Sequence, residues 1–170
     1  ESFEKDVLHN NWGKFDINEK RQLASKGKPS FQLDTILESK SIDQLRDIAN
    51  TRSIKDFEKM KKFELVFNIK NDIFDEHYFF QDMIILSDIS YDFLSYMIEL
   101  TSFEDKNLHP CFFENLVLLG LIGLYENEGK FTFIISHEVK SMHKKMIASP
   151  YAIEIVRCWR TKLHYIANAC

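Results

Sequence analysis

Apolar residues recur at helical spacing along most of this chain, and few residues interrupt them. Glycine occurs five times and proline three times in 170 residues, whereas phenylalanine occurs 15 times. Glycine and proline are the residues least compatible with a helix interior, and apolar side chains at intervals of three and four residues form one helical face. The pattern therefore predicts a mainly α fold with long helices.

The clearest exception to helical spacing lies at about residues 121–135. Two apolar runs, 121–125 and 131–135, flank a polar segment in which Gly129 suits the positive φ of a tight turn. This predicts one β-hairpin, and Ser136 follows it as a candidate N-cap of another helix. The order helix, hairpin, helix across residues 112–148 resembles a winged helix.

The spacing of turn-forming residues predicts three parts. Residues 1–34 have sparse apolar side chains and contain Gly27 and Pro29, so we expect an N-terminal appendage and linker. Residues 35–71 are expected to form two helices joined by a short extended connection, the first with Ser41 as N-cap and the second starting at about Lys59. Residues 72–170 are expected to form a helical domain that carries the hairpin.

Charge is unevenly distributed along the chain, although the formal net charge is only −4. Residues 71–108 hold nine acids and one base, residues 139–162 hold six bases and one acid, and residues 38–70 hold eight bases and six acids. A generic nucleic-acid coat would be basic throughout. Any contact with nucleic acid is therefore expected to be local, on the basic flanks of an acidic middle.

Chemistry-bearing motifs are few. The cysteines Cys111, Cys158 and Cys170 are far apart and form no C-x-x-C motif, so we expect no disulfide framework, no zinc site and a reduced, cytoplasmic environment. The acidic residues around Asp72 lack the spacing of a calcium loop. No phosphate-binding loop or nucleophile motif occurs. We therefore predict a protein without catalytic residues, metal or cofactor.

Residues 42–71 resemble the N-terminal module of the transcription terminator Rho, which is related in shape to the SAP and LEM helix-extended-helix modules. The residues that carry the resemblance are Leu45, Ile48, Ala49, Ile54, Met60, Lys62, Glu64, Leu65, Val66 and Ile69. They cover about 30 of the 170 residues. Two positions depart from the family pattern. Ser53 stands where glycine is usual, at the end of the first helix, where a left-handed conformation is expected. Phe63 stands where a polar residue is usual.

This resemblance implies a nucleic-acid-associated accessory protein of a bacterium or its mobile elements, such as a phage. Basic residues around the second helix become candidate phosphate contacts, with a second basic set on the predicted helix after the hairpin. A solvated basic surface with no ligand is the alternative for both sets. The candidate nucleic-acid contacts are Arg52, Lys55, Lys59, Lys61, Lys62, Lys140, Lys144 and Lys145. The sequence does not distinguish DNA from RNA.

A protein–protein adaptor or inhibitor is the rival function. The acidic middle segment and several phenylalanines that read as exposed would serve a protein partner. The candidate partner-binding residues are Phe63, Phe79, Phe80 and Phe112. A membrane is not expected, because the longest apolar run, residues 116–125, is about half the ~20 residues that a spanning helix needs.

Overall fold

The computed structural model describes residues 15–169, with side chains placed up to residue 163. Residues 1–14 of the expected appendage lie outside this range. The described chain is mainly helical with one small sheet, which confirms the predicted fold class. None of the described helices is both long and apolar enough to cross a membrane.

The helices fall before, between and after the strands. In chain order they are α2 (Ile17–Leu23), α3 (Leu33–Glu38), α4 (Ile42–Thr51), α5 (Lys62–Phe74), α6 (Glu76–Ile85), α7 (Asp88–Leu100), α8 (Glu114–Leu118), α9 (His137–Ile147) and α10 (Pro150–Ala169), with short 3-10 helices η1 (Phe57–Lys59) and η2 (Pro110–Phe112). The strands are β1 (Ser25–Lys26), β2 (Ser102–Glu104), β3 (Gly123–Asn127) and β4 (Lys130–Ile134).

The sheet is built around the predicted hairpin, in the order β1-β3-β4-β2. β3 and β4 are antiparallel, with Asn127 opposite Lys130. The two residues of the turn, Glu128 and Gly129, both have positive φ, at 53° and 79°. That is the geometry which favours glycine in a two-residue hairpin turn. β2 adds antiparallel to β4, and β1 adds parallel to β3; neither short strand was predicted.

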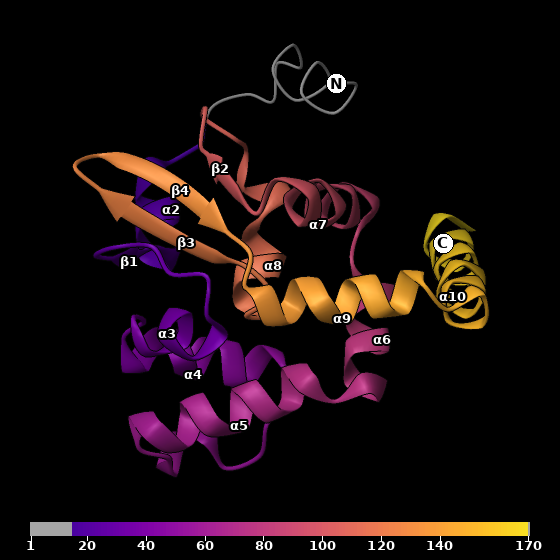
Figure 1. Ribbon diagram of the computed structural model, residues 1–170, viewed down its shortest axis with the longest axis horizontal. Coiled ribbons are helices and arrows are strands. Elements are labelled where there is room, and N and C mark those ends of the chain that lie inside the picture. The colour runs from indigo at the N-terminus through magenta and orange to yellow at the C-terminus, as the bar shows by residue number, and fades with distance from the viewer. Residues whose placement is uncertain (1–14, 170) are drawn as a thin grey trace.

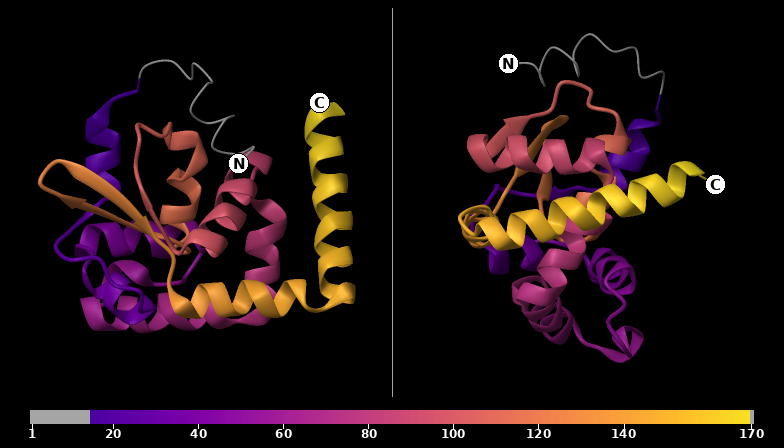
Figure 2. Two further views of the ribbon diagram at one scale, coloured as in Figure 1. Left: turned by 45° about the horizontal axis from the view of Figure 1, so that its top comes forward. Right: turned by 90° about the vertical axis from the view of Figure 1, so that its right-hand side faces the viewer.

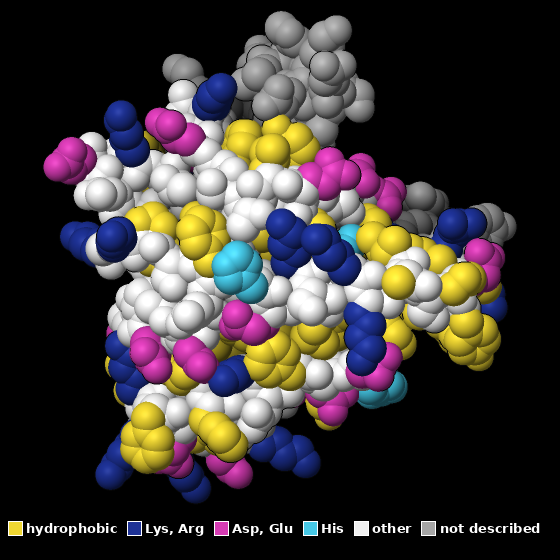
Figure 3. All heavy atoms as spheres, viewed as in Figure 1, with side chains coloured by type: hydrophobic (Ala, Val, Ile, Leu, Met, Phe, Trp, Pro, Cys, Tyr) yellow, Lys and Arg dark blue, Asp and Glu magenta, His cyan; other side chains and the backbone are white. Residues whose placement is uncertain are grey.

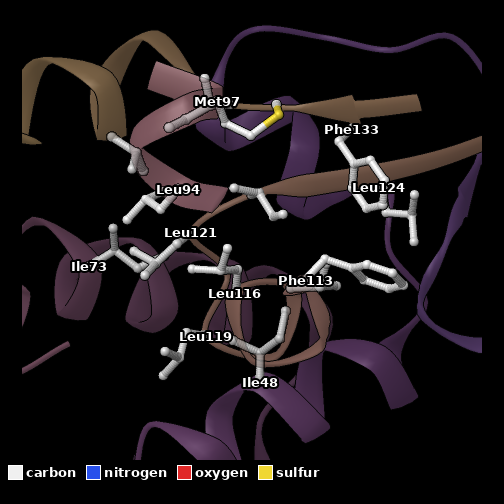
Figure 4. Close-up of a cluster of buried hydrophobic side chains, with 14 of the residues drawn as sticks. Ile48, Ile73, Leu94, Met97, Phe113, Leu116, Leu119, Leu121, Leu124 and Phe133 are labelled. Atoms are coloured by element: carbon white, nitrogen blue, oxygen red, sulfur yellow. The ribbon is translucent and has the colours of Figure 1, made fainter. Parts of the chain in front are cut away.

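The helices surround one continuous core. Figure 1 shows α3, α4 and α5 below the sheet, with α9 crossing between the sheet and α5. α10 turns away sharply at the end of α9 and packs beside α6, standing at the edge of the molecule (Figure 2). Short α8 lies at the centre, where Leu116 and Leu119 lie near Ile48 of α4, and Leu121 lies beside Ile73 of α5 (Figure 4). Residues before and after position 71, the predicted boundary between the second and third parts of the chain, therefore contribute to one hydrophobic core.

Residues 15–34 are bonded to the body of the protein at several points. β1 pairs Ser25 with Tyr125 of β3. Nε2 of Gln44 donates to the carbonyl oxygens of Gln22 and Ala24, at 2.8 and 3.0 Å. These bonds fix the end of α2 against the start of α4. The predicted domain boundaries stay predictions.

The α4–α5 pair follows the apolar pattern of the sequence. Ser41 caps α4 as predicted, through a capping box in which its side chain accepts from the backbone of Gln44 and the Gln44 side chain accepts from Ser41. Leu45 and Ile48 are buried on α4, as is Ile69 on α5. α5 begins at Lys62, later than the predicted start at about Lys59, because η1 occupies 57–59 and Met60 is extended.

Ser53 ends α4 in the left-handed conformation, with φ of 59°. Its N–H donates to the carbonyl oxygen of Asn50 at 3.1 Å, and the N–H of Ile54 donates to that of Ala49 at 2.9 Å. These two bonds make a Schellman motif, in which the left-handed position is usually glycine. The structure thus confirms the conformation anticipated at Ser53.

Replacing Ser53 with glycine is expected to stabilise the protein by about 0.5–1 kcal/mol, because glycine adopts a left-handed conformation without a Cβ clash. Urea unfolding followed by circular dichroism measures the change. Ser53→Ala is the matched control, since alanine keeps the Cβ atom and should bring no gain. Equal stability of the Ser53→Gly and Ser53→Ala variants would contradict this account.

The winged-helix resemblance is limited by what covers α8. In helix-turn-helix proteins the second helix enters the major groove. Here α8 has five residues and packs against α2, α4 and α7. Its exposed side chains are those of Glu114 and Asn115, and the acid would repel phosphate. A winged-helix assignment therefore stays a prediction, and this arrangement does not present α8 to a groove.

Candidate nucleic-acid interface

The segment between α4 and α5 carries a run of exposed lysines. Lys55 follows the α4 turn, Lys59 closes η1, and Lys61 and Lys62 begin α5; all four side chains are exposed. None forms an ion pair with a carboxylate of the described residues. The structure therefore brings these four predicted phosphate contacts together on one accessible edge.

Acidic groups accompany this edge. Asp56 and Glu58 are exposed within the same run. Glu64 turns back toward the start of α5, where its Oε1 accepts from the N–H of Lys61 at 3.4 Å. That carboxylate already occupies the positive end of the helix. Contact with an anion would therefore come from the lysine ammonium groups rather than from the helix amides.

Arg52, predicted as a phosphate contact, is instead a structural residue. Its side chain is 1% exposed and binds carboxylates from two other helices: Nε donates to Asp72 Oδ2 at 2.7 Å, and Nη2 donates to Asp82 Oδ2 at 2.8 Å. Nη1 donates to the carbonyl oxygen of Leu119 at 2.8 Å, just after α8. All arms of the guanidinium are engaged, so the prediction for Arg52 is corrected.

Burial dominates the electrostatics of this Arg52 cluster. The pKa of Asp82 is raised to about 6, chiefly by desolvation; Arg52 acts in the opposite direction, and nearby Asp72 contributes a smaller increase. Two carboxylates share one guanidinium, so their mutual repulsion remains. The cluster joins α4 to α5, α6 and the end of α8. Asp72 and Asp82 thus have a structural role as the partners of Arg52.

The predicted aromatic contacts divide into exposed and buried residues. Phe63 lies at the start of α5 and is 70% exposed. Phe79 and Phe112 are buried in the core, so both are corrected as partner contacts. Phe80 is half-buried and lines a groove of about 450 Å³ between α6 and α9. Phe79 lines the same groove from its buried side, since neighbouring residues of an α-helix point about 100° apart.

Phe67 is an exposed aromatic residue that the sequence analysis missed. It is 63% exposed and lies four residues after Phe63 on the same helix. Residues four apart share a helical face. Leu65 and Ile69 already supply the buried face of α5, and Phe67 does not lie on that face. Its spacing of four residues from Phe63 could therefore have indicated a second exposed ring beside Phe63.

The second basic set is only partly free. Lys144 and Lys145 of α9 are exposed, whereas Nζ of Lys140 donates to Thr101 Oγ1 at 2.7 Å. On this face of the molecule, apolar and acidic side chains separate the Lys and Arg side chains over α9 from those at the lower end (Figure 3). The two predicted basic sets therefore do not form one continuous stripe on that face.

Two neighbours of this second set also have structural positions. His143 is buried on α9, and desolvation lowers the pKa of its imidazole. Arg160 of α10 lies 4.3 Å from the ring centroid of Tyr91. Its guanidinium donates to the carbonyl oxygens of Met83 and Leu86 and to Asp88 Oδ1. Arg160 thus holds α10 to the end of α6.

Residues 37–73 match the family model described as the Rho termination factor, N-terminal domain. The match confirms the resemblance carried by residues 42–71 and includes α4, η1 and nearly all of α5. No curated protein and no solved structure matches the chain. Residues 37–73 therefore form a module similar to the N-terminal domain of the Rho termination factor, set within a longer chain.

Proposed function

We propose that this chain is a non-enzymatic, nucleic-acid-associated accessory protein that contacts the phosphate backbone through lysines between α4 and α5. The observation that carries the proposal is the fate of the eight basic residues in 38–70. Those with structural positions are Lys40, Arg46, Arg52 and Lys70, and those left accessible are Lys55, Lys59, Lys61 and Lys62. The accessible ones lie within eight residues of one another, so they could contact neighbouring phosphates of one backbone.

The four basic residues with structural positions are excluded for physical reasons. Lys40 is buried, and desolvation lowers its pKa to about 8. Arg52 binds its two aspartates. Nζ of Lys70 lies 3.0 Å from Asp34 Oδ2, and Arg46 pairs loosely with Asp43 at 3.7 Å. The remaining candidate phosphate contacts are Lys55, Lys59, Lys61 and Lys62. Lys144 and Lys145 form a separate, weaker group on α9.

Fluorescence anisotropy with labelled single- and double-stranded DNA and RNA tests the proposal at about 50 and 200 mM salt. Three charges are removed in the variant Lys59→Gln/Lys61→Gln/Lys62→Gln. Each phosphate contact on a single strand contributes about 0.7 to the slope of log K against log salt, so the slope should fall by about 2. Affinity should fall uniformly across sequences, because phosphates carry no base identity.

The matched control removes three other exposed lysines, in the variant Lys28→Gln/Lys106→Gln/Lys130→Gln. Its net charge equals that of the test variant, but its salt slope should stay near that of the wild type. Absence of wild-type binding at low salt would refute the function. An equal loss of affinity and salt slope in both variants would show that net charge alone causes the effect. It would contradict the assignment of Lys59, Lys61 and Lys62 as the contact site.

A protein partner is the second candidate. Phe80 lines the groove between α6 and α9 together with Phe74, Met142 and Met146, and the rim carries Glu76 and Lys145. Flexible methionines and aromatic rings suit an apolar peptide. Several acids of the middle segment are already paired within the fold, among them Asp72, Asp82, Asp88 and Asp105. Fewer acids are thus free for a basic partner, which favours nucleic acid as the first candidate.

A further inference from the structure

We propose that Phe63 and Phe67 form a stacking platform for the bases of a single-stranded nucleic acid. The inference rests on the proposed function, because it assigns the kind of strand whose phosphates the lysines would contact. It concerns two phenylalanines and the bases of the ligand, however, whereas the proposed function concerns lysines and the phosphates. The two ideas can therefore fail separately.

The geometry of α5 places the two rings side by side. Phe63 and Phe67 are separated by four residues, or about 6 Å along the helix axis, and lie on one face. They are 70% and 63% exposed. Two rings at this spacing offer one surface to each of two neighbouring bases splayed along the helix.

The exposure of this pair serves no packing role. The opposite face of α5 buries Leu65, Ile69 and Ile73, so the helix is anchored without the two rings. A single exposed apolar residue is ordinary on a protein surface. Two large rings on one face, one helical turn apart, form a patch that costs solubility unless a ligand covers them.

The charge beside the rings selects a polyanion as the occupant. The free lysines Lys59, Lys61 and Lys62 lie directly before Phe63, and exposed Asn71 lies one turn beyond Phe67. Figure 3 shows apolar side chains at the lower end of the molecule with Lys and Arg side chains around them. Aromatic faces next to cations are the combination by which proteins bind single strands, with rings under the bases and cations along the backbone.

A duplex fits the same surface poorly. Its base faces are stacked against one another and are not accessible to a ring unless the bases are unstacked. The helix that would enter a major groove in a helix-turn-helix unit, α8, is covered here by α2 and α4. The exposed elements therefore suit stacking on a single strand better than reading a groove.

The test measures anisotropy of a labelled oligothymidylate and an oligouridylate of about 16 nucleotides, with a duplex of equal length for comparison. The variant Phe63→Ala/Phe67→Ala should bind the single strands about 30-fold more weakly or worse, which equals roughly 1 kcal/mol for each lost stacking contact. Its salt slope should stay unchanged, because no phosphate contact is removed.

Two further variants separate stacking from simple hydrophobicity. Phe63→Leu/Phe67→Leu keeps apolar side chains but removes the aromatic faces, so it should lose affinity as the alanine variant does. Phe63→Trp/Phe67→Trp keeps the faces, so it should bind at least as well as the wild type. Its added tryptophan fluorescence should also be quenched when the oligonucleotide binds. Tyr78→Ala, which removes an exposed ring from α6, is the matched control and should bind normally.

The outcomes distinguish this inference from the function on which it rests. If the wild type binds single strands and the lysine variant weakens binding, but the alanine and leucine variants bind normally, the stacking platform is wrong and the function stands. Preference for the duplex would also overturn it. Sedimentation that shows the wild type as a dimer and the alanine variant as a monomer, with equal affinity for strands, would assign the rings to self-association instead.

Discussion

Replacing Arg52 with methionine is expected to lower the free energy of unfolding by about 3–5 kcal/mol, because Asp72 and Asp82 would lose the guanidinium that binds them both. The carbonyl oxygen of Leu119 would lose its donor as well. Methionine preserves the length of the side chain, so the loss measures charge and hydrogen bonding more than volume. Urea unfolding measures the free energy, and the midpoint of thermal unfolding should fall by about 6–20 °C.

The pH dependence of this loss identifies its cause. Since Arg52 lowers the pKa of Asp82, which is about 6 in the wild type, the variant holds a proton on Asp82 to higher pH. The variant therefore binds more protons when folded, and the difference in stability should grow as pH rises from 5 to 7 and shrink as it falls. Arg157→Met, which removes an exposed pair with Glu154, is the control and should change stability by less than about 0.5 kcal/mol. A loss from Arg52→Met that is small or independent of pH would contradict this account.

Replacing Lys20 with methionine is expected to destabilise the protein by a similar amount, about 3–5 kcal/mol. Nζ of Lys20 bonds Asp105 Oδ2, and the two side chains are 1% and 3% exposed. The ammonium also lies 4.7 Å from the ring centroid of Phe15 and 5.5 Å from that of Phe113. Without Lys20, a buried carboxylate stays unpaired among aromatic rings, and α2 loses its main polar tie to the body of the protein. Denaturant unfolding measures the loss, and faster proteolysis near residue 20 should accompany it.

A second substitution tests whether the unpaired charge causes that loss. Oδ1 of Asp105 also accepts from the N–H of Leu108 at 2.8 Å, a bond that asparagine can keep. The double variant Lys20→Met/Asp105→Asn should therefore recover much of the stability, because it removes the charge together with its partner. Lys26→Met is the control on an exposed lysine and should be close to neutral. A double variant that is no more stable than Lys20→Met would show that packing rather than charge dominates at this site.

Local patterns of the sequence determined a large part of this fold. Ser41 capped α4, Ser136 capped α9 and Gly129 formed the turn of the hairpin, as predicted. Each of these features depends on residues a few positions apart, so the sequence contains all the information that decides it. The left-handed conformation at Ser53 belongs to the same class. The apolar face of the α4–α5 pair was also predictable, because its residues recur at helical spacing along the chain. The family resemblance depends on the same residues.

The candidate site was predictable only in part. The sequence identified Lys59, Lys61, Lys62 and Phe63, which are exposed because they lie at the start of α5 and away from its apolar face. It did not separate them from Arg52, a few residues earlier in the chain. Whether a basic side chain faces solvent or a carboxylate depends on the elements that pack against it, and Asp72 and Asp82 reach Arg52 from other helices.

Only the tertiary structure decided which polar residues belong to the interior. Lys20 and Asp105 are 85 residues apart, and no local pattern predicts that their side chains meet. The same holds for β1, whose two residues pair with a strand about a hundred positions later, and for Phe79, which is buried while Phe80 is only half-buried. The sequence by itself determined helices, caps and the hairpin, because those depend on neighbours along the chain. Long-range packing determined the buried charges, and thereby which lysines and phenylalanines remain free to bind a partner.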